Sequence, residues 1–81
     1  MYYVYVLKSE KDGRLYIGQT NDLEKRLQRH NLGKVISTVK RRPLYLIYSE
    51  EYQSRREAMN RETYLKSLKG GNEFKKILKN S

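Results

Sequence analysis

The amino-terminal segment most narrows the possible folds of this chain, because it holds two β-forming runs around a turn. Residues 2–7, YYVYVL, are aromatic, β-branched or leucine throughout, a composition typical of a β-strand. Asp12-Gly13 follows, a dipeptide common in hairpin turns. Leu15–Gly18 then returns as a second strand. We therefore expect an antiparallel hairpin at the start of the chain.

The side chains of these two strands should divide between two faces, because successive residues of a strand point to opposite sides. One face of the first strand then carries Tyr3, Tyr5 and Leu7, and the other carries Val4 and Val6. Tyr16 lies on the neighbouring strand. Tyrosines on paired strands are usually packing residues, but a buried hydroxyl needs a hydrogen-bond partner.

A helix should follow the hairpin. Asn21 or Asp22 can cap its first turn, and Asn21 with Glu24 approximates a capping box. We expect this helix to run to about Asn31 and to end at Gly33.

The second half of the chain predicts one strand and two more helices. Leu44–Tyr48 is apolar throughout, which favours a buried strand. Ser54 and Glu57 form a capping box for a helix that Gly70-Gly71 stops. A third short helix is indicated by apolar residues at i, i+3 and i+4, which are Phe74, Ile77 and Leu78.

The predicted order is therefore β-β-α-β-α-α. We expect an α/β chain of the α+β type, with a small, mainly antiparallel three-stranded sheet flanked by three helices. A length of 81 residues fits one small domain over residues 1–81.

The charge balance indicates a polyanionic partner. The chain has 18 Lys and Arg against 9 Asp and Glu, a formal net charge of +9, and nucleic acid is the commonest partner of so basic a domain. The absence of cysteine excludes disulfides and thiolate metal sites and fits a cytoplasmic protein. No apolar run approaches the roughly 20 residues of a membrane span, so we expect no membrane partner.

Helical spacing brings two polar groups of the first helix close to the core. Arg26 and His30 share one side, at i and i+4, beside the apolar stripe of Leu23 and Leu27. Arg26 could be a solvated charge whose stem covers apolar surface. His30 could be a helix-end residue satisfied by a carbonyl.

Glu62 should point inward from the second helix, because its direction is close to that of Ala58 and Leu65. An inward carboxylate is costly unless it is paired or binds a cation. Two interpretations stay open: a structural ion pair, or a hard oxygen ligand for Mg²⁺.

These residues together resemble the GIY-YIG nuclease superfamily. Tyr3-Val4-Tyr5 stands in place of the GIY triplet, and Tyr16-Ile17-Gly18 is the YIG triplet eleven residues later. Arg26, His30 and Glu62 follow in the family's order. The chain is most similar to small stand-alone members, which are related to the nuclease domain of the bacterial excision-repair endonuclease.

Two positions depart from the family pattern. Tyr3 replaces the first glycine, which crowds the backbone there. Phe74 stands where members often have an asparagine, and the nearest asparagine is Asn72.

The resemblance implies a metal-dependent endonuclease that hydrolyses phosphodiester bonds of DNA, in repair or recombination. Glu62 would hold one Mg²⁺ or Mn²⁺, and Arg26 would hold the phosphate. Tyr5, Tyr16 or His30 would position and deprotonate water, with Arg26 and the metal lowering a tyrosine pKa. Gly18 would let the chain turn tightly towards the helix. The expected contacts with nucleic acid are Gly18, Gln19, Thr20, Lys25, Arg29, Lys40, Arg41 and Arg42.

Two other functions stay open. One is a nucleic-acid-binding module of the same fold with little or no nuclease activity. The other is a basic component of a larger assembly such as a ribonucleoprotein, although an inward Glu62 argues against it. We expect a monomer or a weak dimer.

Overall fold

The structure is a computed structural model that describes residues 1–79. Its elements in chain order are β1 (Tyr2–Ser9), β2 (Leu15–Thr20), α1 (Leu23–Asn31), a 3-10 turn (Val39–Arg41), β3 (Leu44–Tyr52), α2 (Arg55–Leu68) and α3 (Asn72–Lys79). The predicted order and the mixed α+β class are confirmed. Among the described residues, no helix is both long and apolar enough to cross a membrane.

The three strands form one antiparallel sheet in the order β2-β1-β3, with β1 in the centre. Tyr5 pairs with Gly18, and Leu7 pairs with Tyr16. Because paired residues project to the same face, the Tyr5 ring and the bare backbone of Gly18 are neighbours on one side of the sheet.

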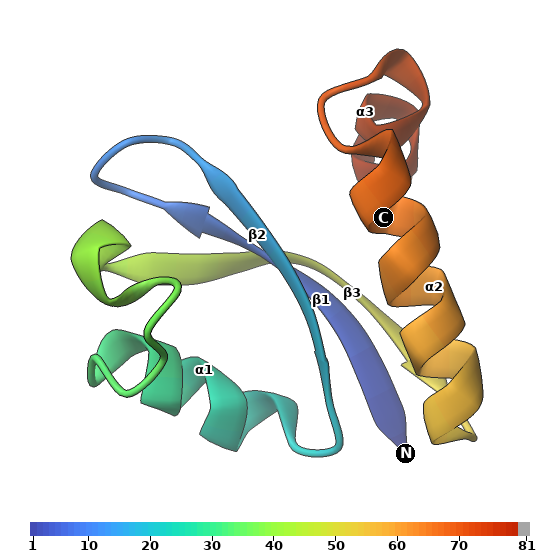
Figure 1. The fold of residues 1–81 in the computed structure, drawn as a ribbon, viewed down its shortest axis with the longest axis horizontal. Helices are drawn as coiled ribbons and strands as arrows, with labels where there is room; N and C mark the ends of the chain where they lie inside the picture. Colours follow the sequence, from blue (N-terminus) through green and yellow to red (C-terminus); the bar gives the residue numbers. More distant parts are fainter. Residues whose placement is uncertain (80–81) are drawn as a thin grey trace.

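Each face of the sheet has its own core (Figure 1). The core against α2 and α3 contains Val4, Val6, Ile17, Ala58, Leu65 and Phe74. The core against α1 contains Tyr5, Leu7 and Leu44, with Tyr16, Leu23 and Leu27 packed around them. This division follows the predicted alternation along β1.

Helix ends follow the expected capping chemistry. Asp22 caps α1, and its Oδ1 accepts from the Lys25 amide at 3.1 Å, so Asp22 rather than Asn21 is the cap. Ser54 caps α2 by accepting from the Glu57 amide at 3.2 Å. Gly70, with φ +87°, follows α2 in a left-handed conformation that favours glycine.

Two boundaries differ from the predictions. β2 continues to Thr20, so Gly18 lies inside a strand and is not a turn residue. The prediction of a buried third strand was wrong, because β3 is an edge strand that runs on to Tyr52 and pairs only with β1. Tyr45 is 45% exposed and Leu46 is 37% exposed, since the helices leave part of this edge uncovered.

Candidate active site

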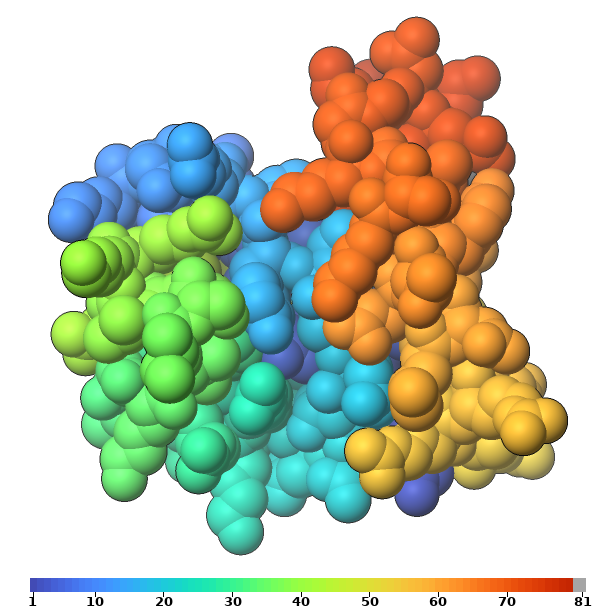
Figure 2. All heavy atoms as spheres, in the orientation of Figure 1, coloured from blue at the N-terminus to red at the C-terminus, as the bar shows by residue number. Residues whose placement is uncertain are grey.

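The predicted site residues gather along the outer strand β2. Figure 2 shows this strand at the floor of a shallow hollow between the surface of the α1 side and that of α2. We call this feature the β2 hollow. Tyr16 and Gly18 come from β2, Tyr5 from β1, Arg26 and His30 from α1, and Glu62 from α2.

Gly18 lets the Tyr5 side chain lie directly against the backbone of β2. A Cβ atom at this position would lie 2.5 Å from the Tyr5 Oη and 2.6 Å from its Cζ. The Tyr5 ring therefore lies across β2 in the space that any other residue would fill. This corrects the predicted role, because Gly18 provides room for Tyr5 rather than a tight turn.

Tyr5 is only 1% exposed, and its hydroxyl has two partners. The Arg26 Nε donates to it at 3.2 Å, and the His30 Nε2 lies 3.0 Å from it. Burial raises the pKa of Tyr5 to about 12, outweighing the lowering effect of the Arg26 hydrogen bond. The hydroxyl is therefore protonated at neutral pH, which disfavours Tyr5 as a base.

His30 is fully buried at the end of α1. Its Nδ1 lies 2.7 Å from the Thr38 Oγ1, and its ring meets the Tyr16 ring edge-on with centroids 4.9 Å apart. Burial, with a smaller contribution from the Arg26 charge, lowers the pKa of His30 to about 4. The imidazole is therefore neutral, and hydroxyl groups rather than a carbonyl satisfy its two nitrogens.

Arg26 is half-buried and remains charged. Its pKa is raised, mainly by the hydrogen bond to Tyr5, and Tyr16 contributes in the same direction. Tyr5 occupies the Nε and Tyr16 also interacts with the guanidinium, so part of the hydrogen-bonding capacity of the two terminal nitrogens is left for other acceptors. Tyr16 is half-buried, so of the two tyrosines it is the more accessible to solvent and ligands.

Glu62 projects from α2 near this group. Its side chain is 19% exposed, and its Oε2 lies 2.9 Å from the Lys66 Nζ. Its negative charge is one of the smaller causes that raise the pKa of Tyr5, so it lies within electrostatic range of that hydroxyl. The open alternative of an ion pair is realised, with a lysine one helical turn away.

The surroundings of Glu62 fit a weakly held divalent cation. Its Oε1 makes no hydrogen bond to the residues that the structure describes, and an i,i+4 ion pair contributes only about 0.3–0.5 kcal/mol. Within residues 1–79 no group of three His, Cys, Asp or Glu side chains could hold a metal ion. A cation here would bind one carboxylate and complete its shell with water and phosphate oxygens, as Mg²⁺ commonly does.

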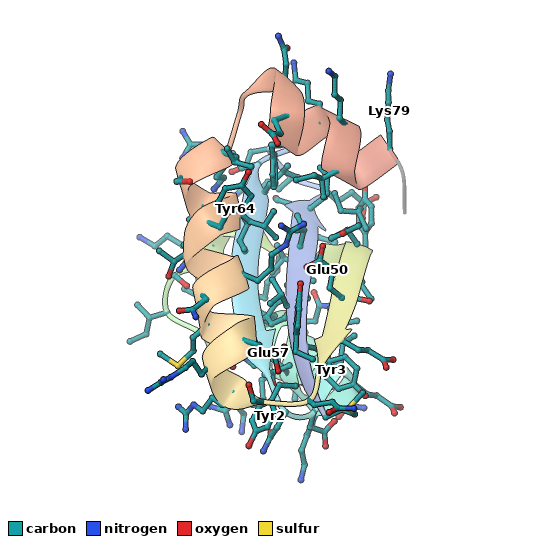
Figure 3. The ribbon with its side chains drawn as sticks, turned by 90° about the vertical axis from the view of Figure 1, so that its right-hand side faces the viewer. Tyr2, Tyr3, Glu50, Glu57, Tyr64 and Lys79 are labelled. Carbon is teal, nitrogen blue, oxygen red and sulfur yellow. The ribbon has the colours of Figure 1, made fainter. Side chains whose placement is uncertain are left out.

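A second ion pair fixes the helix that carries Glu62. Arg61, the preceding residue, binds Glu50 of β3 through Nε–Oε1 at 2.9 Å and Nη2–Oε2 at 3.0 Å. The Tyr52 hydroxyl donates to the same carboxylate at 2.7 Å, and so does the Tyr48 hydroxyl. This bidentate contact between α2 and the sheet, near the labelled Glu50 in Figure 3, sets the rotation of α2.

The residues predicted to contact nucleic acid lie on several separate segments. Lys25 and Arg29 are exposed on α1, and Lys40 and Arg42 are exposed around the 3-10 turn. Gln19 and Thr20 lie in β2, and the Thr20 Oγ1 accepts from the Asp22 amide at 3.1 Å. Thr20 is therefore engaged in ordinary turn chemistry.

Arg41 belongs to a basic group that sequence reasoning did not assemble. Burial lowers the pKa of Lys69, and the charges of Arg41, Arg14 and Lys66 lower it further. Three separate segments thus bring cations together at the Leu15 end of β2, and Asp12 is the acidic residue beside them. We call Arg14, Arg41 and Lys69 the basic cluster. Little in the sequence indicates this cluster, because Lys69 is far from Arg14 along the chain and only Arg14 lies next to β2.

The comparisons with known proteins show which family the chain belongs to. Residues 1–76 match the family model described as the GIY-YIG catalytic domain. The chain belongs to the GIY-YIG family, a superfamily of nucleases.

The similar proteins within this family are small stand-alone ones. The chain is 48% identical over 69 residues to a UPF0213 protein of Clostridium perfringens, covering 84% of this chain and 73% of that protein. It is 47% identical over 68 residues to the UPF0213 protein YazA of Bacillus subtilis, covering 83% and 68%. The solution NMR structure of a UPF0213 protein from Bacillus halodurans is similar with a TM-score of 0.50 and 34% identity, covering 91% and 92% of the two chains.

Proposed function

We propose that this protein is a metal-dependent endonuclease, a single catalytic domain that hydrolyses phosphodiester bonds of DNA in repair or recombination. One observation supports the proposal: the Tyr5 hydroxyl is hydrogen-bonded to Arg26 and lies next to His30, Tyr16 packs on the His30 ring, and Glu62 lies within electrostatic range of the same hydroxyl. The family supplies the nuclease class, and the net charge of +9 supports a nucleic-acid substrate.

Arg26 is the proposed phosphate ligand. Its raised pKa keeps Arg26 positively charged. The hydrogen bond from its Nε to Tyr5 orients the planar guanidinium before substrate binds. It can then donate two hydrogen bonds to one phosphate from its terminal nitrogens. Those bonds would strengthen as the phosphate gains negative charge during water attack.

Glu62 is the proposed ligand of Mg²⁺ or Mn²⁺. A metal bound there would neutralise charge on the phosphate and acidify water. The Lys66 ammonium must give up Oε2, or share the carboxylate, for such an ion to bind.

We assign the contact with the attacking water to Tyr16. Tyr5 and His30 are buried and bonded to each other, whereas Tyr16 is half-buried beside Arg26. Tyr5 and His30 then act as positioning residues. The basic cluster would bind a second phosphate of the bound DNA strand, next to the one at Arg26. Arg14 precedes Tyr16 by two residues, which places it about 7 Å away along an extended chain.

Purified protein should nick supercoiled plasmid in Mg²⁺ or Mn²⁺ and not in EDTA. Arg26→Ala and Glu62→Gln should remove cleavage while the fold persists by circular dichroism. Matched controls are Arg56→Ala, exposed on α2, and Glu51→Gln, exposed on β3. If the wild type leaves plasmid, branched and single-stranded DNA intact, the enzyme proposal fails.

A binding module is the second candidate, because Glu62 is paired with Lys66 and belongs to no group of three His, Cys, Asp or Glu side chains within residues 1–79 that could hold a metal ion. Binding that weakens steeply with salt, without cleavage in either metal, would select this candidate. The same experiment with RNA in place of DNA tests the choice of substrate.

A further inference from the structure

Thr38 is a buried hydroxyl that the proposed chemistry does not use. It lies between α1 and β3 and is 0% exposed. Two turns hold its backbone, because its amide donates to the Val35 carbonyl at 3.1 Å and its own carbonyl accepts from the Arg41 amide at 2.9 Å. Its Oγ1 lies 2.7 Å from the His30 Nδ1 and 3.5 Å from the Val35 carbonyl oxygen.

The donors around Thr38 can be assigned by counting hydrogens. The Arg26 Nε–H can only donate, so the Tyr5 oxygen accepts from it. Within residues 1–79, the Tyr5 O–H has one hydrogen-bond acceptor, the His30 Nε2, which must therefore accept. A neutral imidazole that accepts at Nε2 carries its hydrogen on Nδ1, and that hydrogen points at the Thr38 Oγ1.

The opposite direction would leave a donor unpaired. If the His30 Nε2 carried the hydrogen, the Tyr5 oxygen would accept two bonds and its own buried O–H would have no acceptor. Such an unpaired buried donor costs about 1–3 kcal/mol. The bonds therefore run one way, from Arg26 through Tyr5 and His30 to Thr38.

We infer that Thr38 is a positioning residue that holds His30 in the Nδ1–H tautomer, because its hydroxyl donates to the Val35 carbonyl and leaves its oxygen to accept from the His30 Nδ1. In that tautomer the Tyr5 hydroxyl points at His30, and the Tyr5 lone pair faces the Arg26 guanidinium. Thr38 thereby orients the proposed phosphate-binding residue, Arg26, through two intervening side chains, those of His30 and Tyr5. The effect on cleavage depends on the proposed nuclease function, whereas the tautomer does not.

His30 is the only histidine of the chain, so its tautomer can be read from one imidazole. In protein labelled with ¹⁵N-histidine, two-bond ¹H–¹⁵N correlation spectra distinguish a protonated from an unprotonated ring nitrogen. Near pH 7, the wild type should show a protonated Nδ1 and an unprotonated Nε2. Thr38→Ser, which keeps the hydroxyl, should show the same. Thr38→Val, which removes it at nearly equal volume, should shift the population towards the Nε2–H form.

Two outcomes overturn the inference. One is a wild-type spectrum with the hydrogen on Nε2, and the other is a Thr38→Val spectrum identical to that of the wild type. If Thr38→Val does not fold, Tyr5→Phe decides, because Thr38 alone should still hold the Nδ1–H form. Loss of that form in Tyr5→Phe would show that Tyr5, not Thr38, sets the tautomer.

The cleavage rate supplies the second readout. Thr38→Val should lower the rate at saturating DNA at least tenfold, and Thr38→Ser should recover most of that loss. Ser37→Ala, an exposed neighbour, should match the wild type. A Thr38→Val rate equal to that of the wild type contradicts the positioning role. If the wild type itself does not cleave, the proposed function fails and the spectrum still tests Thr38.

Discussion

Gly18→Ala should damage the site through a single methyl group. The added Cβ would stand 2.5 Å from the Tyr5 Oη, where ordinary contact begins at 3.4 Å, so the hydroxyl must move by about 0.9 Å. A displacement of that size can carry the bond from Arg26, now 3.2 Å, beyond hydrogen-bond range. Overpacking and the loss of buried hydrogen bonds together should lower the free energy of unfolding by about 2–4 kcal/mol.

The effect on cleavage should exceed the effect on folding. Misplacing a group that orients substrate by about 1 Å can cost on the order of 10²-fold in rate. Urea denaturation followed by circular dichroism measures the stability, and plasmid nicking measures the rate, below the temperature at which the variant unfolds. Ile17→Val is the matched control, because Ile17 precedes Gly18 but packs in the opposite core. It should lose about 0.5–1.5 kcal/mol and keep its activity.

A double-mutant cycle tests whether the clash with Tyr5 is the cause. Tyr5→Leu removes the far end of the ring, so it should cost less stability beside Ala at position 18 than beside Gly18, by at least about 1 kcal/mol. Additive effects of the two substitutions, or a Gly18→Ala variant with wild-type stability and rate, would refute the reasoning.

Three further predictions concern charges. Lys66→Met frees both oxygens of Glu62, so half-maximal cleavage should need several-fold less Mg²⁺, measured by metal titration. Burial alone would raise the pKa of Glu50, but hydrogen bonds, led by that of Arg61, lower it. The stability from the Glu50–Arg61 pair should therefore be full above about pH 4.3 and be lost as the pH falls further. Urea titrations at several pH values should show this loss in the wild type and not in Glu50→Gln. Folding lowers the pKa of His30 from 6.5 to about 4, so it favours the neutral imidazole. The stability linked to this group should be complete above pH 6.5 and be lost as the pH falls towards 4, by at most about 3.4 kcal/mol, measured as the difference from His30→Gln.

Local patterns in the sequence were enough to predict the elements of the fold. The Asp12-Gly13 turn, the alternation along YYVYVL and the caps at Asp22 and Ser54 each depend on neighbours within a few residues. The exposure of β3 was missed, because packing between distant segments decides whether a helix covers an apolar strand.

The members of the candidate site were proposed from the sequence, and the contacts among them were not. Helical spacing correctly turned Arg26 and His30 towards the core. The role of Gly18 depends on a register that pairs it with Tyr5, and no local pattern reveals that register. The contact between His30 and Thr38 depends on how a loop folds back over α1, and a lone threonine gives no sequence signal of it.

The separation of the two cores has a consequence for how the protein opens. The helix with Arg26 and His30 rests on one face of the sheet, and the helix with Glu62 rests on the other. Proteins often unfold locally in cooperative units of this size. Detachment of α2 and α3 would remove the carboxylate and leave the arginine, both tyrosines and the histidine in place. Such a partly open molecule would keep the proposed phosphate ligand and lose the proposed metal ligand, so we expect nucleic-acid binding to outlast cleavage as the protein is warmed.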